Sequence, residues 1–380
     1  MINPFKVNIS NQVLDSIYAK VKKYPWHEMP DDGGWEYGTN LDYMKEITNY
    51  WVSDFDWRKH EAHINKFPNF KTEVNDIEIH FIIEKGSGSN PMPLLLMHGW
   101  PGSIVEFLHI IEKLAHPEQF GGNKEDAFDV IVPSLPGFGF SGRPSRPIGP
   151  RKIADIFNKL IIENLNYESY LAQGGDWGAT IANWLAYDHS KTCKAIHINC
   201  LTMRHPDGPQ TKEEEDWQIR FDKDQIMQDG YRTQQATKPQ TLSYAMMDSP
   251  VGVAAWILEK MHSWSDLKNN EIESVFSKDT LLSNIMVYLV TQSFNTASWI
   301  YYGRREEGGR LFPKNFKKIK TPTGVAVFPS EMSEWPPRSY VDRIFNIKHW
   351  TEMTSGGHFA AMEEPDKLVN DIVKFAKAIR

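Results

Sequence analysis

The stretch SYLAQGGDWGATIANWLAYD, residues 169–188, decides the fold. Its first part is a short apolar run that ends in two glycines, which is typical of a buried β-strand, and residues 179–187 have the spacing of a helix. Between the two, the frame G-x-D-x-G places Asp176 on a sharp turn. This is the context of a nucleophile elbow, in which a strand-to-helix turn presents one side chain above a sheet.

The same strand–loop–helix rhythm repeats on both sides of this stretch. Short apolar runs bounded by Gly or Pro occur at residues 92–99, 129–139, 194–200, 323–331 and 349–357, and residues 71–83 alternate as half-buried strands do. Helical spacing follows at residues 104–114, 153–165 and 365–379. Such repetition predicts an α/β fold with a mostly parallel central sheet and helices on both faces.

Two segments depart from this rhythm. Residues 1–70 contain short helical patterns interrupted by Pro25, Pro30 and glycines, which predicts an N-terminal helical arm. Residues 203–310 carry charge clusters and long helical patterns at 251–261 and 280–302 without a convincing strand, which predicts an inserted helical lid. We therefore expect the α/β core to comprise residues 71–202 and 311–380.

Composition narrows the function. The 380 residues carry a net charge of −7, and their 42 Lys and Arg form no long basic run, which argues against nucleic acid as a partner. Cys193 and Cys200 have no metal-binding spacing, and no cofactor is expected. No signal sequence or apolar run of membrane-spanning length is found, so we expect a cytoplasmic protein without a membrane anchor. Whether the chain forms a homo-oligomer stays open.

An aspartate at the elbow position points to a particular chemistry. A carboxylate nucleophile forms an alkyl ester, so Asp176 suits attack at an sp3 carbon that bears a leaving group. No G-x-S-x-G occurs in the chain, which disfavours a serine esterase. The alternative is that Asp176 is an ordinary loop residue that caps a helix.

A second motif, HGWPGS at residues 98–103, follows an apolar run. In folds with a nucleophile elbow, the loop at this point donates one backbone N–H to an oxyanion hole, and the residue after the nucleophile donates the other. The donors would then be the amides of Trp100 and Trp177. The alternative is a plain Gly/Pro loop.

Candidates for the base and the acid come later in the chain. His358, in SGGHF, falls between the last expected strand and the last helix, where this fold places its general base. Glu331 ends an expected core strand and would hold the imidazole tautomer and stabilise the imidazolium. Glu334 and Asp342 are rival candidates for the acid.

Several segments together resemble one known family. HGWPGS, SLPGFGFS, GGDWGA and GGHFAAMEEP are similar to the characteristic segments of α/β-hydrolase-fold epoxide hydrolases. The likeness is to the microsomal-type branch, with its N-terminal extension and its juvenile-hormone, fungal and bacterial relatives. It extends to FKVNIS…YPW near the N-terminus and to the segment that begins GYRTQQATKP, and it covers most of the chain.

This resemblance implies an enzyme that converts an apolar epoxide and water to a vicinal diol, with a role in detoxification. It implies Asp176 as the nucleophile, with His358 and Glu331 activating water. It further implies two lid tyrosines that bind the epoxide oxygen, Tyr231 and Tyr301, and Tyr302 is the alternative to Tyr301. The vertebrate microsomal enzymes carry an N-terminal membrane anchor, and this chain shows none.

Two other functions compete. A haloalkane dehalogenase shares the aspartate, histidine and acid but binds its halide through indole or amide N–H groups, and the abundance of Trp keeps this reading open. The GY…TKP and DSPVG segments favour the epoxide branch. A non-catalytic binding protein of the same fold would be expected to lack a member of the triad, and all members are present here.

Overall fold

A nine-stranded sheet forms the centre of the computed structural model, which describes residues 1–31 and 33–379. The strand order in the described residues is β1-β2-β3-β5-β4-β6-β7-β8-β9. Strands β4 to β9 pair in parallel, and β1, β2, β3 and β5 pair antiparallel along the other edge. The strands are β1 (Asn3–Phe5), β2 (Asn69–Val74), β3 (Ile77–Glu84), β4 (Met92–Met97), β5 (Phe128–Pro133), β6 (Tyr170–Gly174), β7 (Cys193–Ile198), β8 (Pro322–Val327) and β9 (Asn346–Glu352).

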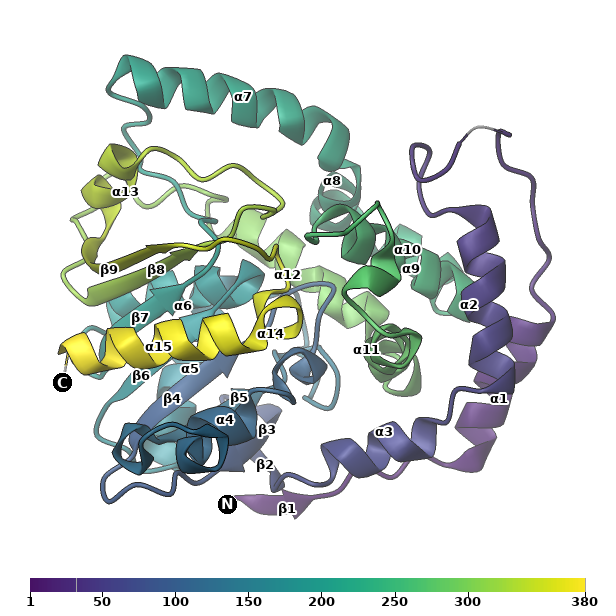
Figure 1. Ribbon diagram of the computed structural model, residues 1–380, viewed down its shortest axis with the longest axis horizontal. Helices are drawn as coiled ribbons and strands as arrows, with labels where there is room; N and C mark the ends of the chain where they lie inside the picture. Colours follow the sequence, from purple (N-terminus) through teal and green to yellow (C-terminus); the bar gives the residue numbers. More distant parts are fainter. Residues whose placement is uncertain (32, 380) are drawn as a thin grey trace.

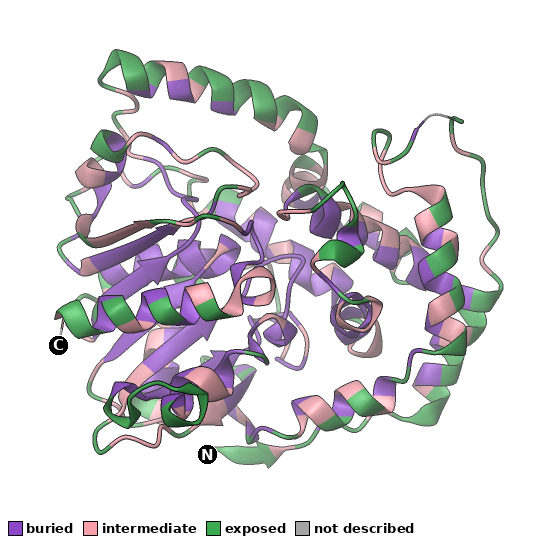
Figure 2. Ribbon diagram, viewed as in Figure 1, coloured by how far each residue is buried: buried purple, intermediate pink, exposed green. Residues whose placement is uncertain are grey.

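Helices cover both faces of the sheet (Figure 1). In the view shown, α15 (Pro365–Ile379) lies in front and contacts α4 (Ile111–Ala115), while α5 (Pro150–Lys159) and α6 (Asp176–Asp188) pack together behind. All residues of β5 and β6 are buried, as Figure 2 shows for the centre of the sheet. Burial on both faces explains why these strands read as continuous apolar runs, and the expected α/β-hydrolase fold is confirmed.

The chain between β7 and β8 forms the helical lid. Its helices are α7 (Lys212–Gln228), α8 (Gly230–Thr237), α9 (Pro239–Met246), α10 (Pro250–Ser263), α11 (Lys278–Val290) and α12 (Phe294–Glu306). The N-terminal arm comprises α1 (Asn11–Lys22), α2 (Leu41–Ser53) and α3 (Trp57–Ile64), and it packs on α10 and α11 of the lid. The arm therefore supports the lid from the side away from the sheet (Figure 1). No helix in the described residues is long and apolar enough to cross a membrane.

Some elements differ from the sequence expectation. Residues 104–114 form a 3₁₀ turn (Ile104–Phe107) and the short α4 instead of one helix, because their apolar side chains are buried on several sides and packing overrides helix propensity. The pattern at 280–302 is two helices, α11 and α12, separated by Gln292 with a left-handed φ of 52°. Strand β1 and helix α3 were not expected.

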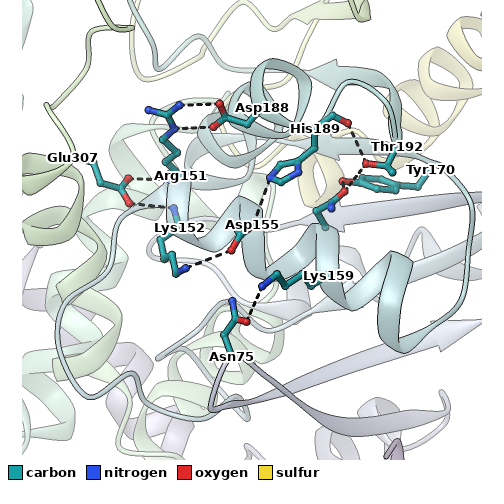
Figure 3. A network of polar contacts seen from close by, with 11 residues as sticks. Asn75, Arg151, Lys152, Asp155, Lys159, Tyr170, Asp188, His189, Thr192 and Glu307 are labelled. Carbon is teal, nitrogen blue, oxygen red and sulfur yellow. Dashed lines mark hydrogen bonds and ion pairs between the residues drawn. The ribbon is translucent and has the colours of Figure 1, made fainter.

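Helix α12 is fixed against the core at its C-terminal end. Glu307 accepts hydrogen bonds from the backbone N–H groups of Arg151 (2.9 Å) and Lys152 (3.0 Å) at the start of α5, as Figure 3 shows. An anion is favourable at a helix N-terminus, so this contact stabilises both elements. One turn earlier, a Cβ on Gly303 would lie 2.1 Å from the backbone of Ile148, so only glycine allows this approach. These contacts set the position of the side chains that α12 presents to the cavity described below.

Candidate active site

Asp176 lies on the strand-to-helix turn between β6 and α6. Its φ is +45°, a left-handed conformation that is uncommon for a residue other than glycine and that recurs at functional turns. The turn is tight: a Cβ on Gly178 would lie 1.9 Å from the carbonyl oxygen of Met97 in β4. The two strands and the helix therefore hold the Asp176 carboxylate at the carboxyl end of the sheet, beneath the lid.

The two amides proposed for the oxyanion hole both donate hydrogen bonds to this carboxylate. The N–H of Trp100 donates to Oδ1 of Asp176 at 2.8 Å, and the N–H of Trp177 also hydrogen-bonds the carboxylate. Burial raises the pKa of Asp176, while the charge of His358 and the two amide hydrogen bonds lower it, and the balance leaves it above its ordinary value. Both amides that an oxyanion hole would need are thus already hydrogen-bonded to the Asp176 carboxylate.

His358 and Glu331 form a buried pair beside the nucleophile. Nδ1 of His358 lies 2.5 Å from Oε1 of Glu331, and Nε2 lies 3.8 Å from Oδ2 of Asp176. Burial lowers the pKa of His358, but the charge of Glu331, hydrogen bonds with Cys200 and Glu331, and the charge of Asp176 raise it well above its ordinary value. The resting imidazole is therefore stabilised in its charged form by two carboxylates.

The rival acids lie elsewhere. Glu334 forms an ion pair with Arg220 at 2.7 Å, and Asp342 pairs with Arg338 at 3.0 Å, all at partly exposed positions. Neither carboxylate contacts His358, which leaves Glu331 as the acid that the structure brings to the histidine.

Both tyrosines named in the sequence reach the site from the lid. Tyr231, at the start of α8, stacks on Trp100 with ring centroids 5.1 Å apart, and Tyr301, in α12, meets Trp177 edge to face at 4.7 Å. The buried Tyr301 hydroxyl interacts with the side chains of Tyr231 and Trp177. Burial raises the pKa of both phenols most, followed by the charge of Asp176 for Tyr231 and by the charges of Tyr231 and Asp176 for Tyr301, so both stay neutral.

Tyr302, the alternative to Tyr301, points away from this cavity. Its ring packs against the guanidinium group of Arg305, with 4.7 Å between Cζ and the ring centroid, and it does not line the cavity. The helical turn that follows Gln292 therefore places Tyr301, and not its neighbour, opposite the nucleophile.

A narrow cavity of about 20 Å³ connects these groups. Asp176, Trp177, Tyr231 and Tyr301 line one part of it, and side chains from the lid, from α6 and from the segments after β7 and β8 line the rest. Among the latter are four arginines that the sequence did not single out: Arg204, Arg232, Arg304 and Arg310. Because a volume of this size holds little more than one water molecule, a substrate requires the lid to move.

Sequence reasoning also missed Glu106. Its carboxyl lies beside Gly99 and Gly102 and shares a second cavity, of about 10 Å³, with Asp176 and His358. Burial raises the pKa of Glu106 to about 8, with the charge of His358 acting in the opposite direction. The signal in the sequence is a single charged residue within the apolar run 104–111, which is unusual for a segment packed in a core.

One group of side chains has the composition of a metal site. The ligand atoms of Cys200, Glu331 and His358 lie within 4.8 Å of one another. However, the short hydrogen bond between Glu331 and His358 occupies the Nδ1 atom, and burial raises the pKa of the Cys200 thiol to about 11, so it stays protonated. Since thiol ligands bind metals as thiolates, this arrangement fits a proton-handling pair better than a metal site.

Comparisons with known proteins show the family and the fold of the chain. The family model described as the epoxide hydrolase N terminus matches residues 2–107, and the model described as the alpha/beta hydrolase fold matches residues 92–247. The structure is similar to that of the juvenile hormone epoxide hydrolase of Bombyx mori, with a TM-score of 0.89, 28% identity and coverage of 100% of this chain and 95% of the other. The Aspergillus niger epoxide hydrolase gives a TM-score of 0.86, 29% identity and coverage of 100% and 97%.

Curated relatives cover nearly the whole chain. Epoxide hydrolase 1 of Sus scrofa is 35% identical over 401 residues, which cover 98% of this chain and 88% of the relative. Juvenile hormone epoxide hydrolase 1 of Ctenocephalides felis is 31% identical over 405 residues, with coverage of 100% and 86%. With such identity over its full length, and with this fold, the chain belongs to the epoxide hydrolases of the α/β-hydrolase fold.

Proposed function

We propose that this epoxide hydrolase works through a covalent ester on Asp176, which His358 and Glu331 then hydrolyse. The observation that carries the proposal is the setting of the Asp176 carboxylate. Its Oδ1 atom is bound by the backbone of the oxyanion loop, while its Oδ2 atom faces His358. One oxygen is thus held by amides, and the other is available to attack.

In the first half-reaction, Oδ2 of Asp176 forms a bond to an epoxide carbon as the carbon–oxygen bond of the ring breaks. The oxygen that leaves needs a proton or a hydrogen bond, and the hydroxyls of Tyr231 and Tyr301 face the nucleophile from the lid. Because burial keeps both phenols neutral, each can donate to the developing alkoxide. The product is an alkyl ester on Asp176 with a hydroxyl group on the adjacent carbon.

In the second half-reaction, water attacks Cγ of the Asp176 ester. Ester formation removes the negative charge that faces Nε2 of His358, so the pKa of the imidazole falls and the ring releases its proton, which restores the tyrosine that protonated the alkoxide. The neutral ring can then accept a proton from the attacking water. The oxyanion at Oδ1 is held by the amides of Trp100 and Trp177. The ester bond then breaks, the diol leaves, and Glu331 stabilises the imidazolium until its proton is lost.

The second cavity suits the attacking water. Its volume of about 10 Å³ is close to that of a single water site, and Asp176, His358 and Glu106 all line it. Gln173, also in its wall, has a buried Oε1 atom without a hydrogen-bond partner among the described residues. We infer that Glu106, kept neutral by burial, donates a hydrogen bond that helps to orient this water.

One observation supports the alternative hypothesis of a haloalkane dehalogenase. The indole N–H of Trp100 is buried without a hydrogen-bond partner in the part of the chain that the structure describes, and such a group can hold a halide. A panel of styrene oxide, aliphatic epoxides and 1-haloalkanes separates the two functions. We expect diol formation that is abolished in Asp176→Asn, and release of halide with no diol would contradict the proposal.

A further inference from the structure

Three arginines extend along the wall of the active-site cavity. This arginine cluster consists of Arg204, Arg304 and Arg310. The first two are buried, with 8% and 9% of their surface exposed, and Arg310 is partly exposed. The Cζ atom of Arg304 lies 5.2 Å from the ring centroid of Trp177, and those of Arg204 and Arg310 lie 4.5 Å and 5.6 Å from that of Phe221. The cluster thus reaches from the residue beside the nucleophile to helix α7 of the lid.

The arginine cluster has no counter-ion of its own. In residues 1–31 and 33–379, no carboxylate oxygen lies within 4.0 Å of any of its nitrogen atoms. The groups that accept its hydrogen bonds are neutral, among them Leu201 O for Arg204 (3.0 Å), Thr202 O for Arg304 (2.5 Å) and Gln225 Oε1 for Arg310 (3.2 Å). Arg232, in the wall of the same cavity, differs because it forms an ion pair with Asp229.

Such an arrangement is electrostatically unfavourable without a ligand. Burial lowers the pKa of Arg204 and of Arg304 to about 10, and the charge of Arg310 lowers that of Arg204 further. The negative charge of Asp176 stabilises the charged form of Arg304 against the effect of burial. That charge disappears when Asp176 becomes an ester. Burying a charged group without a counter-ion costs free energy. Buried, unpaired arginines in the wall of an active site therefore indicate that their counter-ion arrives with the substrate.

We propose that the arginine cluster binds an anionic group of the substrate, and that the preferred substrate is an epoxide bearing a carboxylate. Guanidinium groups pair with carboxylates through two parallel hydrogen bonds, and a carboxylate is the acidic group that a narrow cavity accommodates most easily. The sequence predicts an apolar epoxide, and this inference refines that expectation to an apolar body with an acidic end. It rests on the proposed function, because the epoxide must still reach Asp176.

The test compares acids with their neutral esters. The substrates are 4,5-epoxypentanoate, 7,8-epoxyoctanoate and 4-(oxiran-2-yl)benzoate, each beside its methyl ester, and the readout is kcat/KM. We expect at least one acid to exceed its ester by roughly tenfold or more, as hydrogen bonds to charged groups typically give. Arg310→Gln and Arg204→Gln should each reduce the ratio of kcat/KM for the acid to kcat/KM for its ester at least about fivefold.

Arg305→Gln is the matched control. Arg305 follows Arg304 in α12, but its side chain is 49% exposed and pairs with Glu306 outside the cavity. Its removal changes the net charge of the protein by the same amount as Arg204→Gln or Arg310→Gln and should leave the acid preference intact. A second measurement on the unaltered enzyme is independent of variant folding: octanoate should inhibit ester turnover competitively at roughly tenfold lower concentration than octanamide.

The outcomes separate this inference from the proposed function. Turnover of esters without an advantage for any acid, together with equal inhibition by octanoate and octanamide, would overturn the anionic subsite and leave the epoxide hydrolase mechanism standing. Equal losses on acids and esters in the arginine variants would also overturn it, because the cluster would then act on the reacting centre. Absence of diol from every epoxide would count against the proposed function itself.

Discussion

Nε2 of His358 lies 3.8 Å from Oδ2 of Asp176, beyond the length of a hydrogen bond. The nucleophile is therefore oriented by the backbone amides of Trp100, which binds Oδ1, and of Trp177, and not by the base. This separation divides the chemistry, because a carboxylate that is already charged needs no base to attack, whereas its ester needs an activated water.

His358→Gln should stop turnover after the first half-reaction. Alkylation needs only Asp176 and the two tyrosines, while hydrolysis needs a proton acceptor at the position of Nε2. We expect stoichiometric consumption of epoxide, a mass increase on the peptide that contains Asp176, and less than about a thousandth of the normal diol rate, comparable with the loss of an oxyanion donor. Intact-protein and peptide mass spectrometry measure this. Normal turnover, or failure to alkylate at all, would show that the division of labour is wrong.

The pH dependence of alkylation should follow the ionisation of Asp176. Its pKa lies above the ordinary value, and only the charged form attacks, so alkylation is complete at higher pH and declines as the pH falls through this raised pKa. The charge of His358 lowers the pKa of Asp176. In His358→Gln, where that charge is absent, the midpoint should therefore move to higher pH. Stopped-flow tryptophan fluorescence, which reports on Trp100 and Trp177, gives the midpoint in each protein, and a shift to lower pH would contradict the account.

Tyr231→Phe and Tyr301→Phe should each slow alkylation by roughly ten- to a hundredfold, and the double variant should abolish it. Either hydroxyl alone still donates to the epoxide oxygen, because both face Asp176 from the lid. Tyr302→Phe is the control, since its ring packs on Arg305 outside the cavity. A double variant that alkylates at a near-normal rate would remove the tyrosines from the mechanism.

Asp371 should contribute to stability through its charge. It accepts hydrogen bonds from His197 (2.9 Å), His349 (2.7 Å) and Thr351 (2.6 Å), which join α15 to β7 and β9. Burial acts to raise its pKa, but these partners lower it to about 2. A depressed pKa gives stability that is present above the unfolded value near 3.8 and is lost as the pH falls towards 2.

Asp371→Asn should therefore cost about 2 kcal/mol of unfolding free energy at neutral pH, and the deficit should shrink below about pH 4. Asp366→Asn in the same helix is the control, because its side chain is 77% exposed and its ion pair with Lys113 should contribute little. Urea unfolding of the three proteins from pH 7 to pH 3 measures the difference. A deficit that does not depend on pH would assign the role of Asp371 to packing.

Much of the fold could be predicted because its central strands are buried on both faces and therefore appear as uninterrupted apolar runs, each followed by a glycine-bounded turn. The candidate site could be predicted because Asp176, Glu331 and His358 each follow an expected strand. The carboxyl ends of parallel strands meet at one edge of the sheet, which brings these three residues together. The break at Gln292 was not predictable, because the helical pattern continues through it and only a left-handed φ interrupts it.

The arginine side chains that complete the cavity could not be predicted from the sequence. Arg204, Arg304 and Arg310 are separated by up to about a hundred residues and look like solvated charges, the usual role of arginine. Their shared position depends on how α12 and the segment after β7 pack, which no local pattern encodes. Glu106 differs, because a single carboxylate within an apolar run is unusual and can be recognised in the sequence.

Isotope labelling tests the covalent intermediate most directly. In a single turnover in H₂¹⁸O with enzyme in excess, the oxygen added to the epoxide should come from Asp176, because its Oδ2 atom bonds the epoxide carbon and water attacks the ester at Cγ. We predict that the first diol is unlabelled, that the peptide containing Asp176 gains one ¹⁸O, and that diol from later turnovers carries the label. A first diol that is fully labelled from solvent, with an unlabelled Asp176 peptide, would show direct attack by water and contradict the account.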